Sequence, residues 1–417
     1  MNTTTNSEHK IDKIIREIEM KKLKTAYNEY NAVIKLISKF IIKKKLILYG
    51  GFVINVILPK HLRFYKDYTI NDFDCLSKDP LNDSIELSKI IKSKGYSYIK
   101  IKKAKHKGTY RVFVYGKQIF DISIVKSNIY DNILKYSKKE NKVLKYYKDK
   151  YSIIPLPIIK RNLHKELSRP EQSGYRWEKL YERLQLLNKV YPTALSTVKY
   201  ECVKIPPLYK GLVNNILNYI KKAKNPIIDS FALKLYKGLK GNCCGRINDS
   251  SKYITILSTD YEKTKNDIIK IVRDCDLSNH RIDSHNFIDK DEILYTHYDI
   301  KLINTEDNTI FNLINIINVK NECLSIQESK GNGYTLGSLD SVLYYLYATY
   351  IYYTIYTSDA SISVEKLYYI NEFESYIKNN IHNNILKRLK SNCYGTINYG
   401  DDIKDVWRRK LTLKYIT

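Results

Sequence analysis

The feature that most constrains the fold is the order of short apolar runs and glycines near residue 50. Leu46–Tyr49 is apolar, Gly50 and Gly51 follow it directly, and the apolar stretch Phe52–Leu58 ends at Pro59. Adjacent glycines between apolar runs are typical of a tight turn, and a proline disfavours continuation of a helix. The order predicts a strand, a glycine turn and a helix, which is how an α/β (α+β) unit begins.

Three aspartates follow on segments with strand character. Residues 73–76 are predicted as a strand that starts directly after Asp72 and contains Asp74. Because side chains alternate along a strand, these two carboxylates share one face. Asp121 lies among apolar residues in a hairpin predicted over residues 111–125. A third carboxylate on a neighbouring strand can complete a site with the first two.

This carboxylate set favours a two-metal site. When a hydroxyl attacks an α-phosphate and pyrophosphate leaves, charge builds on both oxygens, and two hard cations held by carboxylates stabilise it. We therefore predict Asp72, Asp74 and Asp121 as both metal ligands and catalytic residues, with Mg²⁺ or Mn²⁺ as the two ions.

The glycine turn is predicted to bind the nucleotide. Gly50 and Gly51 precede a helix, whose N-terminal N–H groups can hold triphosphate oxygens without a Cβ in the way. Asn55, about one turn further, is predicted to help order the nucleotide. The alternative for Asn55 is an ordinary asparagine on a helix surface.

A helix predicted over residues 173–191 carries one apolar and one basic face. Arg176, Lys179 and Arg183 share the basic face. We predict that they contact RNA or the triphosphate. The alternative is a charged face that is only solvated, as on most amphipathic helices.

The charge of the chain indicates a polyanionic partner. A formal net charge of +27 and a pI near 9.4 suit phosphate backbones, so nucleic acid is the first expectation and an anionic membrane surface the second. Lysine and tyrosine are also what an A+T-rich genome encodes by codon bias. The 39 tyrosines therefore identify no individual RNA contact.

The cysteines predict a reducing compartment. The seven cysteines are scattered and odd in number, and no secretory signal precedes them. Cys243 and Cys244 form the one close pair and lack the C-x-x-C spacing of a zinc site, and the eight histidines are dispersed. Free buried thiols without zinc are expected.

An uncharged stretch over residues 341–358 is long enough to suggest a membrane span. It contains seven tyrosines, and Leu339, Val342, Leu343 and Leu346 trace one helical stripe. We predict a half-buried helix of a soluble protein and no membrane partner.

At its glycines and aspartates the chain resembles the DNA polymerase β-like nucleotidyltransferase superfamily. The matching motifs are Leu48–Gly51, Asn71–Asp74 and Asp121. The interval between the first two is longer than in many members, which leaves room for an extra loop over residues 59–67.

Later motifs resemble the poly(A) polymerase catalytic subunits of large cytoplasmic DNA viruses, of the poxvirus and giant-virus type. They are Glu166–Pro170, Ser173–Lys179 with Arg183, Gly337–Asp340 and Cys393–Gly395. The resemblance spans residues 45–400.

The resemblance implies a template-independent enzyme that transfers AMP from ATP to single-stranded RNA 3′ ends with two metal ions. It implies either a separate processivity subunit, as in poxvirus relatives, or a homodimer, as in some giant-virus relatives. It also implies location in the host cytoplasm, at the viral factory, or packaging in the virion.

Four segments are predicted along the chain. Residues 1–45 form an N-terminal helical segment, 46–165 the catalytic nucleotidyltransferase domain, 166–205 a bridging helix and 206–417 a second α/β domain. The resemblance implies that this last domain is a degenerate nucleotidyltransferase. Its strand, turn and helix over residues 227–232 indeed lack Gly-Gly and a following Asp-x-Asp.

Two other functions stay open. The chain could be a noncatalytic RNA-binding subunit that retains the fold, although the three intact aspartates argue against it. It could also be a nucleotidyltransferase acting on tRNA, a protein or a small molecule. The residues themselves do not select the base.

Overall fold

The computed structural model describes residues 4–65, 72–104, 106–140, 151–169, 173–193, 202–204, 206–237, 243–245, 254–275, 277–288, 293–319, 322–328, 333–357, 360–380, 392–395 and 412–413. The chain divides into two compact units, Met1–Pro155 with Tyr399–Thr417, and Leu156–Asn398. The four-segment division predicted from the sequence stays a prediction.

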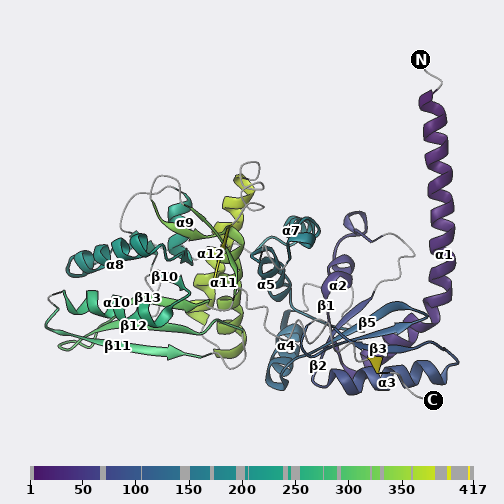
Figure 1. Ribbon diagram of the computed structural model, residues 1–417, viewed down its shortest axis with the longest axis horizontal. Helices are drawn as coiled ribbons and strands as arrows, with labels where there is room; N and C mark the ends of the chain where they lie inside the picture. The colour runs from purple at the N-terminus through teal and green to yellow at the C-terminus, as the bar shows by residue number, and fades with distance from the viewer. Residues whose placement is uncertain are drawn as a thin grey trace. The chain divides into compact units, whose positions relative to one another are not determined.

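The first unit begins with one continuous helix, α1 (Thr4–Lys44). Its C-terminal part packs on the unit through Val33, Ile37, Phe40 and Ile41, all at most 2% exposed. Its N-terminal part extends away from the sheet (Figure 1), and apolar side chains there, such as Ile14, are about half exposed. The helical character predicted for this segment is confirmed over Thr4–Lys44.

A mixed seven-stranded sheet forms the centre of the first unit, in the order β17-β3-β4-β5-β2-β1-β6. The elements of this unit are β1 (Ile47–Tyr49), α2 (Gly50–Ile57), η1 (Lys60–Leu62), β2 (Phe73–Ser77), α3 (Pro80–Ser93), β3 (Lys100–Lys103), β4 (Thr109–Val114), β5 (Lys117–Ile124), α4 (Ser127–Glu140), β6 (Ser152–Ile153) and β17 (Thr412–Leu413). The predicted strand, glycine turn, helix and hairpin are confirmed. The last strand comes from the C-terminal end of the chain and pairs antiparallel with β3.

The second unit contains an eight-stranded sheet in the order β11-β12-β13-β10-β8-β15-β14-β16, and β7 pairs separately with β9. Its strands are β7 (Cys202–Lys204), β8 (Ile227–Ile228), β9 (Cys243–Gly245), β10 (Ile254–Ser258), β11 (His280–Phe287), β12 (His297–Asn304), β13 (Ile310–Asn318), β14 (Leu324–Glu328), β15 (Thr335–Gly337) and β16 (Asn392–Tyr394). Its helices are α5 (Leu156–Leu167), η2 (Gly174–Arg176), α7 (Trp177–Val190), η3 (Pro207–Tyr209), α8 (Lys210–Ala223), α9 (Ser230–Tyr236), α10 (Tyr261–Arg273), α11 (Leu339–Tyr352), the π-helical η4 (Tyr353–Thr357) and α12 (Ala360–Asn379).

The second sheet repeats the topology of the first. The strands β11-β12-β13-β10-β8-β15 follow the same order as β3-β4-β5-β2-β1-β6. The pairs β10–β13 and β8–β15 are parallel, as are β2–β5 and β1–β6. The remaining pairs within each set of six are antiparallel in both sheets. The predicted second domain of nucleotidyltransferase-like topology is therefore present in the second unit.

The turn after the central strand is also repeated. In the first unit, the Ser77 hydroxyl accepts a hydrogen bond from the Asp79 N–H at 2.9 Å, and Asp79 caps α3. In the second unit, Ser258 accepts from the Asp260 N–H at 3.2 Å, and Asp260 caps α10. Because each cap satisfies N–H groups that the helix itself leaves open, the same local chemistry starts both helices.

Helix α11 is more buried than its sequence predicts. Twelve of its residues, including Leu343 and Tyr347, are buried, because the helix packs against α5, α12 and strands of the second sheet (Figure 1). The prediction of a half-buried helix is wrong, since α11 is covered on more than one side. Among the described residues, no helix combines the length and the apolarity that a membrane crossing requires.

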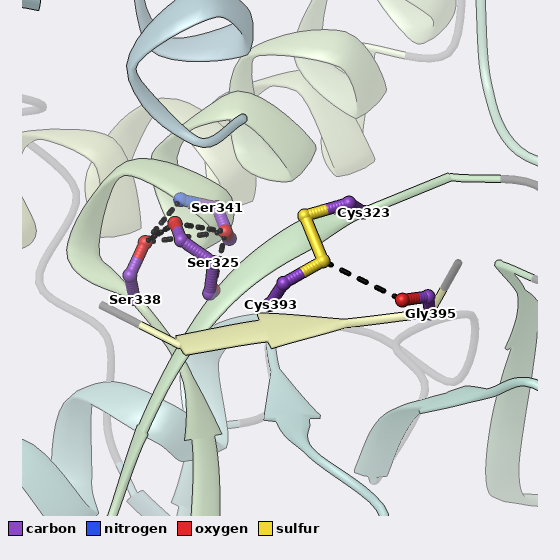
Figure 2. Close-up of a disulfide and its surroundings, with 6 residues drawn as sticks. All are labelled: Cys323, Ser325, Ser338, Ser341, Cys393 and Gly395. Atoms are coloured by element: carbon purple, nitrogen blue, oxygen red, sulfur yellow. Dashed lines mark hydrogen bonds between the residues drawn. A yellow bond between two sulfur atoms is a disulfide. The ribbon is translucent and has the colours of Figure 1, made fainter. Parts of the chain in front are cut away.

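The prediction that all cysteines are free is wrong for one pair. Cys323, directly before β14, forms a disulfide with Cys393 of β16, 70 residues away (Figure 2). Beside it, Ser325, Ser338 and Ser341 form a buried hydrogen-bonded cluster (Figure 2). Among the cysteines whose side chains the structure describes, Cys75 and Cys275 are free.

Candidate active site

The structure brings the three predicted carboxylates together. Asp74 on β2 lies directly opposite Asp121 on β5, because the two strands pair in parallel in that register. Asp72 precedes β2 by one residue, two positions before Asp74. One ligand oxygen from each carboxylate lies within 4.8 Å of the other two, a spacing that allows them to share bound metal. The geometry therefore fits a site for hard divalent cations.

Gly50 closes one side of this cluster. Its φ of +77° is a conformation that favours glycine, and it starts α2 directly after β1. A Cβ atom at this position would overlap the Asp74 carboxylate. Gly51 is buried in the first turn, and Tyr49 provides no side-chain cap for α2. The first N–H groups of a helix have no acceptor within the helix itself, and such groups can donate to an anion.

Two further side chains orient the carboxylates, and the sequence did not single them out. The Gln118 amide donates to Asp72 at 3.0 Å and to Asp121 at 2.9 Å. Arg111 Nε lies 3.2 Å from an Asp121 oxygen, because these two residues are cross-strand partners. Gly116, which lies in the hairpin turn with positive φ, was the sequence signal for the hairpin but not for the register of these contacts.

Burial sets the protonation of the third aspartate. Asp121 is 8% exposed, and this burial raises its pKa to about 6. The positive charge of Arg111 acts in the opposite direction, while the negative charge of Asp72 raises the pKa further. A divalent cation would favour the ionised carboxylate.

The Asn55 side chain is buried and bonds to the backbone of the following loop. It is 7% exposed, and its side-chain oxygen accepts a hydrogen bond from the Tyr65 N–H at 2.9 Å. Arg63 donates to the carbonyl oxygens of Val56 and Leu58, so the chain after α2 is fastened back onto the helix. The surface alternative is wrong, and the nucleotide role stays a prediction. Of the predicted loop over residues 59–67, the last two residues lie outside the described part.

The residues of the predicted basic face belong to the second unit, with Arg176 at the end of η2 and Lys179 and Arg183 on α7. Lys179 is exposed, Arg176 is half-buried and Arg183 is only 7% exposed. The predicted apolar face is confirmed by the burial of Trp177, Leu180, Leu184 and Leu187. The alternative of a basic face that is only solvated is wrong at Arg183, and contact of the three residues with RNA or triphosphate stays a prediction.

Residues of the later motifs form contacts between elements of the second unit. Ser173 donates to Glu166 at 2.7 Å, and Arg169 pairs with Glu322 at 2.7 Å. Ser338 caps α11. A Cβ at Gly395, which has a φ of +93°, would collide with backbone carbonyl oxygens of residues 319 and 322. These motifs therefore specify packing; Pro170 lies outside the described residues.

The second unit has lost the carboxylates at the equivalent place. Tyr49 and Ile228 each directly precede a residue with positive φ, so the two are equivalent positions. Tyr49 pairs with Asp74 and Ile228 pairs with Thr255, which makes Thr255 the counterpart of Asp74. Thr255 pairs in turn with Asn315, the counterpart of Asp121.

The counterpart of Gly50 is Asp229, with a φ of 80°. Its carboxylate accepts hydrogen bonds from Lys366 Nζ at 2.8 and 3.0 Å, and from Thr255 at 3.3 Å. A lysine ammonium thus occupies the region that corresponds to the carboxylate cluster of the first unit, and this region is not a second copy of that cluster.

Gly50→Ala is expected to lower metal affinity by about tenfold or more, because the new methyl group displaces the Asp74 carboxylate. Calorimetric titration with Mn²⁺ measures the effect. Gly116→Ala is the matched control, since Gly116 also has positive φ but a Cβ there meets nothing within 4 Å. Equal losses in both variants would show that backbone strain, and not the contact with Asp74, is responsible.

Asp121→Asn is expected to stabilise the metal-free protein at pH 7.5. The native pKa of about 6 exceeds the ordinary value of 3.8, so the native state binds more protons between these values and loses stability as pH rises through them. Removing the ionised carboxylate should recover on the order of 1–3 kcal/mol. Thermal unfolding in EDTA should show this gain at pH 7.5 and little of it at pH 4. A variant less stable than the wild type at both pH values would contradict the assignment.

Comparison with known proteins finds similarity over part of the chain. Residues 35–173 match the family model described as Poly(A) polymerase catalytic subunit. A protein of Acanthamoeba polyphaga mimivirus described as "Putative poly(A) polymerase catalytic subunit" is 30% identical over 201 residues, which are 45% of this chain and 32% of that protein. A protein of the same description from African swine fever virus (isolate Pig/Kenya/KEN-50/1950) is 32% identical over 181 residues, or 41% of this chain and 35% of that protein.

These matches confirm the resemblance predicted from the sequence. The alignments span about a third of the length of either curated relative. A solved structure, the crystal structure of the Megavirus polyadenylate synthase, superimposes with a TM-score of 0.70 at 18% identity, over 95% of this chain and 81% of that one. The two proteins therefore share a fold that includes both units.

Proposed function

We propose that this chain is the catalytic component of a template-independent poly(A) polymerase, which transfers AMP from ATP to the 3′-hydroxyl of RNA. The observation that carries the proposal is the cluster of Asp72, Asp74 and Asp121 beside the positive-φ Gly50. The match of residues 35–173 to poly(A) polymerase catalytic subunits supports the choice of substrate class.

Asp72, Asp74 and Asp121 would hold two divalent cations, Mg²⁺ or Mn²⁺. Such ions stabilise the charge on the attacking and leaving oxygens of an in-line displacement. Gln118 fixes the orientation of Asp72 and Asp121 through its two hydrogen bonds. The N–H groups at the start of α2, at Gly50 and Gly51, would bind the triphosphate.

The acceptor would be a single-stranded RNA 3′ end. A net charge of +27 suits a phosphate backbone, and binding should weaken steeply as salt rises. The relatives' description as a catalytic subunit supports a second, processivity subunit, and a homodimer is the alternative. The viral origin of those relatives supports activity in the host cytoplasm, at the viral factory, or packaging in the virion.

The deciding experiment supplies one nucleotide at a time. The protein is incubated with a short RNA primer, Mg²⁺ or Mn²⁺, and ATP, CTP, GTP or UTP separately, and extension is followed on a sequencing gel. We expect ATP-dependent extension that Asp121→Asn abolishes.

Other outcomes would select other functions. Addition of CTP and then ATP to tRNA ends alone would indicate a tRNA nucleotidyltransferase. RNA binding without nucleotide transfer, unchanged in Asp121→Asn, would indicate a noncatalytic subunit. Transfer to a protein or small molecule together with weak RNA binding at physiological salt would indicate another acceptor class.

A further inference from the structure

Three positive side chains gather on one face of α5 and the residues directly after it. Arg161, Lys165 and Arg169 recur at intervals of four, so they lie one above the next along the helix direction. The Arg161 guanidinium lies 5.4 Å and Lys165 Nζ 5.9 Å from the ring centre of Tyr344 on α11. All three cations are half-buried, in a place where opposite charge is needed to balance them.

Among the described residues, one carboxylate forms an ion pair with these three cations. Glu322 accepts hydrogen bonds from Arg169 at 2.7 Å and from the Tyr295 hydroxyl at 2.6 Å. Within the part of the chain that the structure describes, no carboxylate forms an ion pair with Arg161 or Lys165. Counted over the described residues, the cluster therefore carries an excess of two positive charges.

The guanidinium groups also retain unused donors. Arg161 reaches two uncharged oxygens, the Asn162 side chain at 3.4 Å and the Ile293 carbonyl at 3.1 Å. The Nε atoms of Arg161 and Arg169 are buried and have no acceptor among the described residues. Since buried donors are nearly always satisfied in folded proteins, these atoms indicate an acceptor that the described residues do not supply.

The neighbouring phenol reports the positive potential. Burial alone would raise the pKa of Tyr344, but the charges of Lys165, Arg161 and Arg169 outweigh it and lower that pKa. For Lys165, the phenol acts to raise the pKa, but burial and the two guanidinium groups together lower it. A group with negative charge and several acceptor oxygens would relieve both effects.

We propose that Arg161, Lys165 and Arg169 bind a phosphate group. Planar guanidinium groups match the oxygens of a phosphate, and an ammonium adds a compact charge beside them. The two sources of such a group, an RNA phosphodiester and a nucleotide triphosphate, rest on the proposed function, whereas the phosphate site itself does not. All three residues belong to the second unit, whereas the three aspartates belong to the first.

The test measures binding to the full chain in the Asp74→Asn background without metal, so that its outcome is independent of catalysis. The probes are a fluorescent single-stranded oligoadenylate, followed by anisotropy, and inorganic tripolyphosphate, followed by calorimetry. We expect Arg161→Gln and Lys165→Gln each to weaken binding of at least one probe by about tenfold. Lys165→Arg should retain most of the affinity.

Matched controls separate a site from general charge. Lys189→Gln and Arg273→Gln remove the same charges elsewhere on the second unit and should change affinity by less than about twofold. A loss confined to the oligoadenylate assigns the site to RNA, with a salt dependence lower by about one ion per side chain. A loss confined to tripolyphosphate assigns it to the triphosphate.

The proposal is overturned if neither probe is affected more than in the controls while thermal unfolding shows that the variants are folded. If Lys165→Gln does not fold, the wild type supplies the second measurement. Tripolyphosphate or oligoadenylate should raise the unfolding temperature of the wild type by several degrees. This gain should be absent in the double variant Arg161→Lys,Lys165→Met if that protein folds. If it does not fold, the gain should be absent in Arg161→Gln. A gain that persists in the folded variant also overturns the proposal.

Discussion

Replacing Asp74 with asparagine is expected to reduce ATP-dependent primer extension by about 10³-fold or more, since metal-ion stabilisation contributes several kcal/mol and each 1.36 kcal/mol is tenfold in rate. Asp74 is at the centre of the cluster, opposite Asp121 and against Gly50. Asparagine keeps the shape but removes the charge that holds a cation. Single-turnover extension rates measure the loss, and Mn²⁺ titration shows whether it comes from metal binding.

Asp79→Asn is the matched control for this prediction. Asp79 lies beyond the end of the same strand and caps α3. Asparagine is about as good an N-cap as aspartate, so the variant makes the same chemical change with little effect on the helix. Full activity in Asp79→Asn and loss in Asp74→Asn would locate the metal site. Unchanged metal affinity and activity in Asp74→Asn would remove the basis of the proposed function.

The first half of the candidate site could be predicted because its determinants are local. The positive φ at Gly50 favours glycine, and the runs of apolar residues on each side predict the strand and the helix. Asp72 and Asp74 share a face by strand periodicity alone. The position of Asp121 beside them needed only the assumption that neighbouring strands pair.

Arg111 and Gln118 show where local patterns end. Their contacts with Asp121 depend on the hairpin register, which a β-bulge between Val112 and Phe113 shifts by one residue. Because such a shift moves side chains from one face to the other, counting from the turn at Gly116 alone does not give the pairing on both sides of the bulge. The orienting residues therefore became visible only in the structure.

Long-range packing explains the other differences. Arg183 is on the polar side of its helix in sequence, yet the fold covers it. Cys323 and Cys393 are brought together by β14 and β16, which pair across 70 residues, a connection that spacing cannot predict. Helix α11 combines apolar residues with tyrosines, and several elements cover it. Its tyrosine hydroxyls form hydrogen bonds there, such as the one to Glu374 on α12.

The duplicated topology was the hardest feature to predict from the residues alone, because the second unit lacks the glycines and carboxylates that mark the first. Its β8 strand has two residues, and Thr255 and Asn315 stand where the first unit has aspartates. The second unit keeps the structural frame of the first, meaning its strand order and its turns. Ser258 and Asp260, for example, repeat the turn of Ser77 and Asp79. A frame can be kept after its chemistry is lost, because packing and caps depend on different residues from metal binding.

Lys366→Met is expected to lower the free energy of unfolding of the second unit by about 3–5 kcal/mol, the usual cost of removing one partner from a buried ion pair. Lys366 and Asp229 are both at most 8% exposed in their side chains and lie 2.8 Å apart. The pKa of Lys366 is raised because the nearby carboxylates of Asp229 and Glu365 outweigh the opposing effect of burial. Without the ammonium, Asp229 would remain as a buried charge opposite Thr255.

Urea unfolding of Lys366→Met measures this cost, and Lys237→Met is the matched control. Lys237 pairs with Glu372 at 2.7 Å, but both side chains are about a third exposed, so its loss should cost at most about 1 kcal/mol. Adding Asp229→Asn to Lys366→Met should recover part of the stability, since asparagine tolerates positive φ and carries no charge. If the double variant were no more stable than Lys366→Met, the uncompensated charge of Asp229 would not be the source of the lost stability.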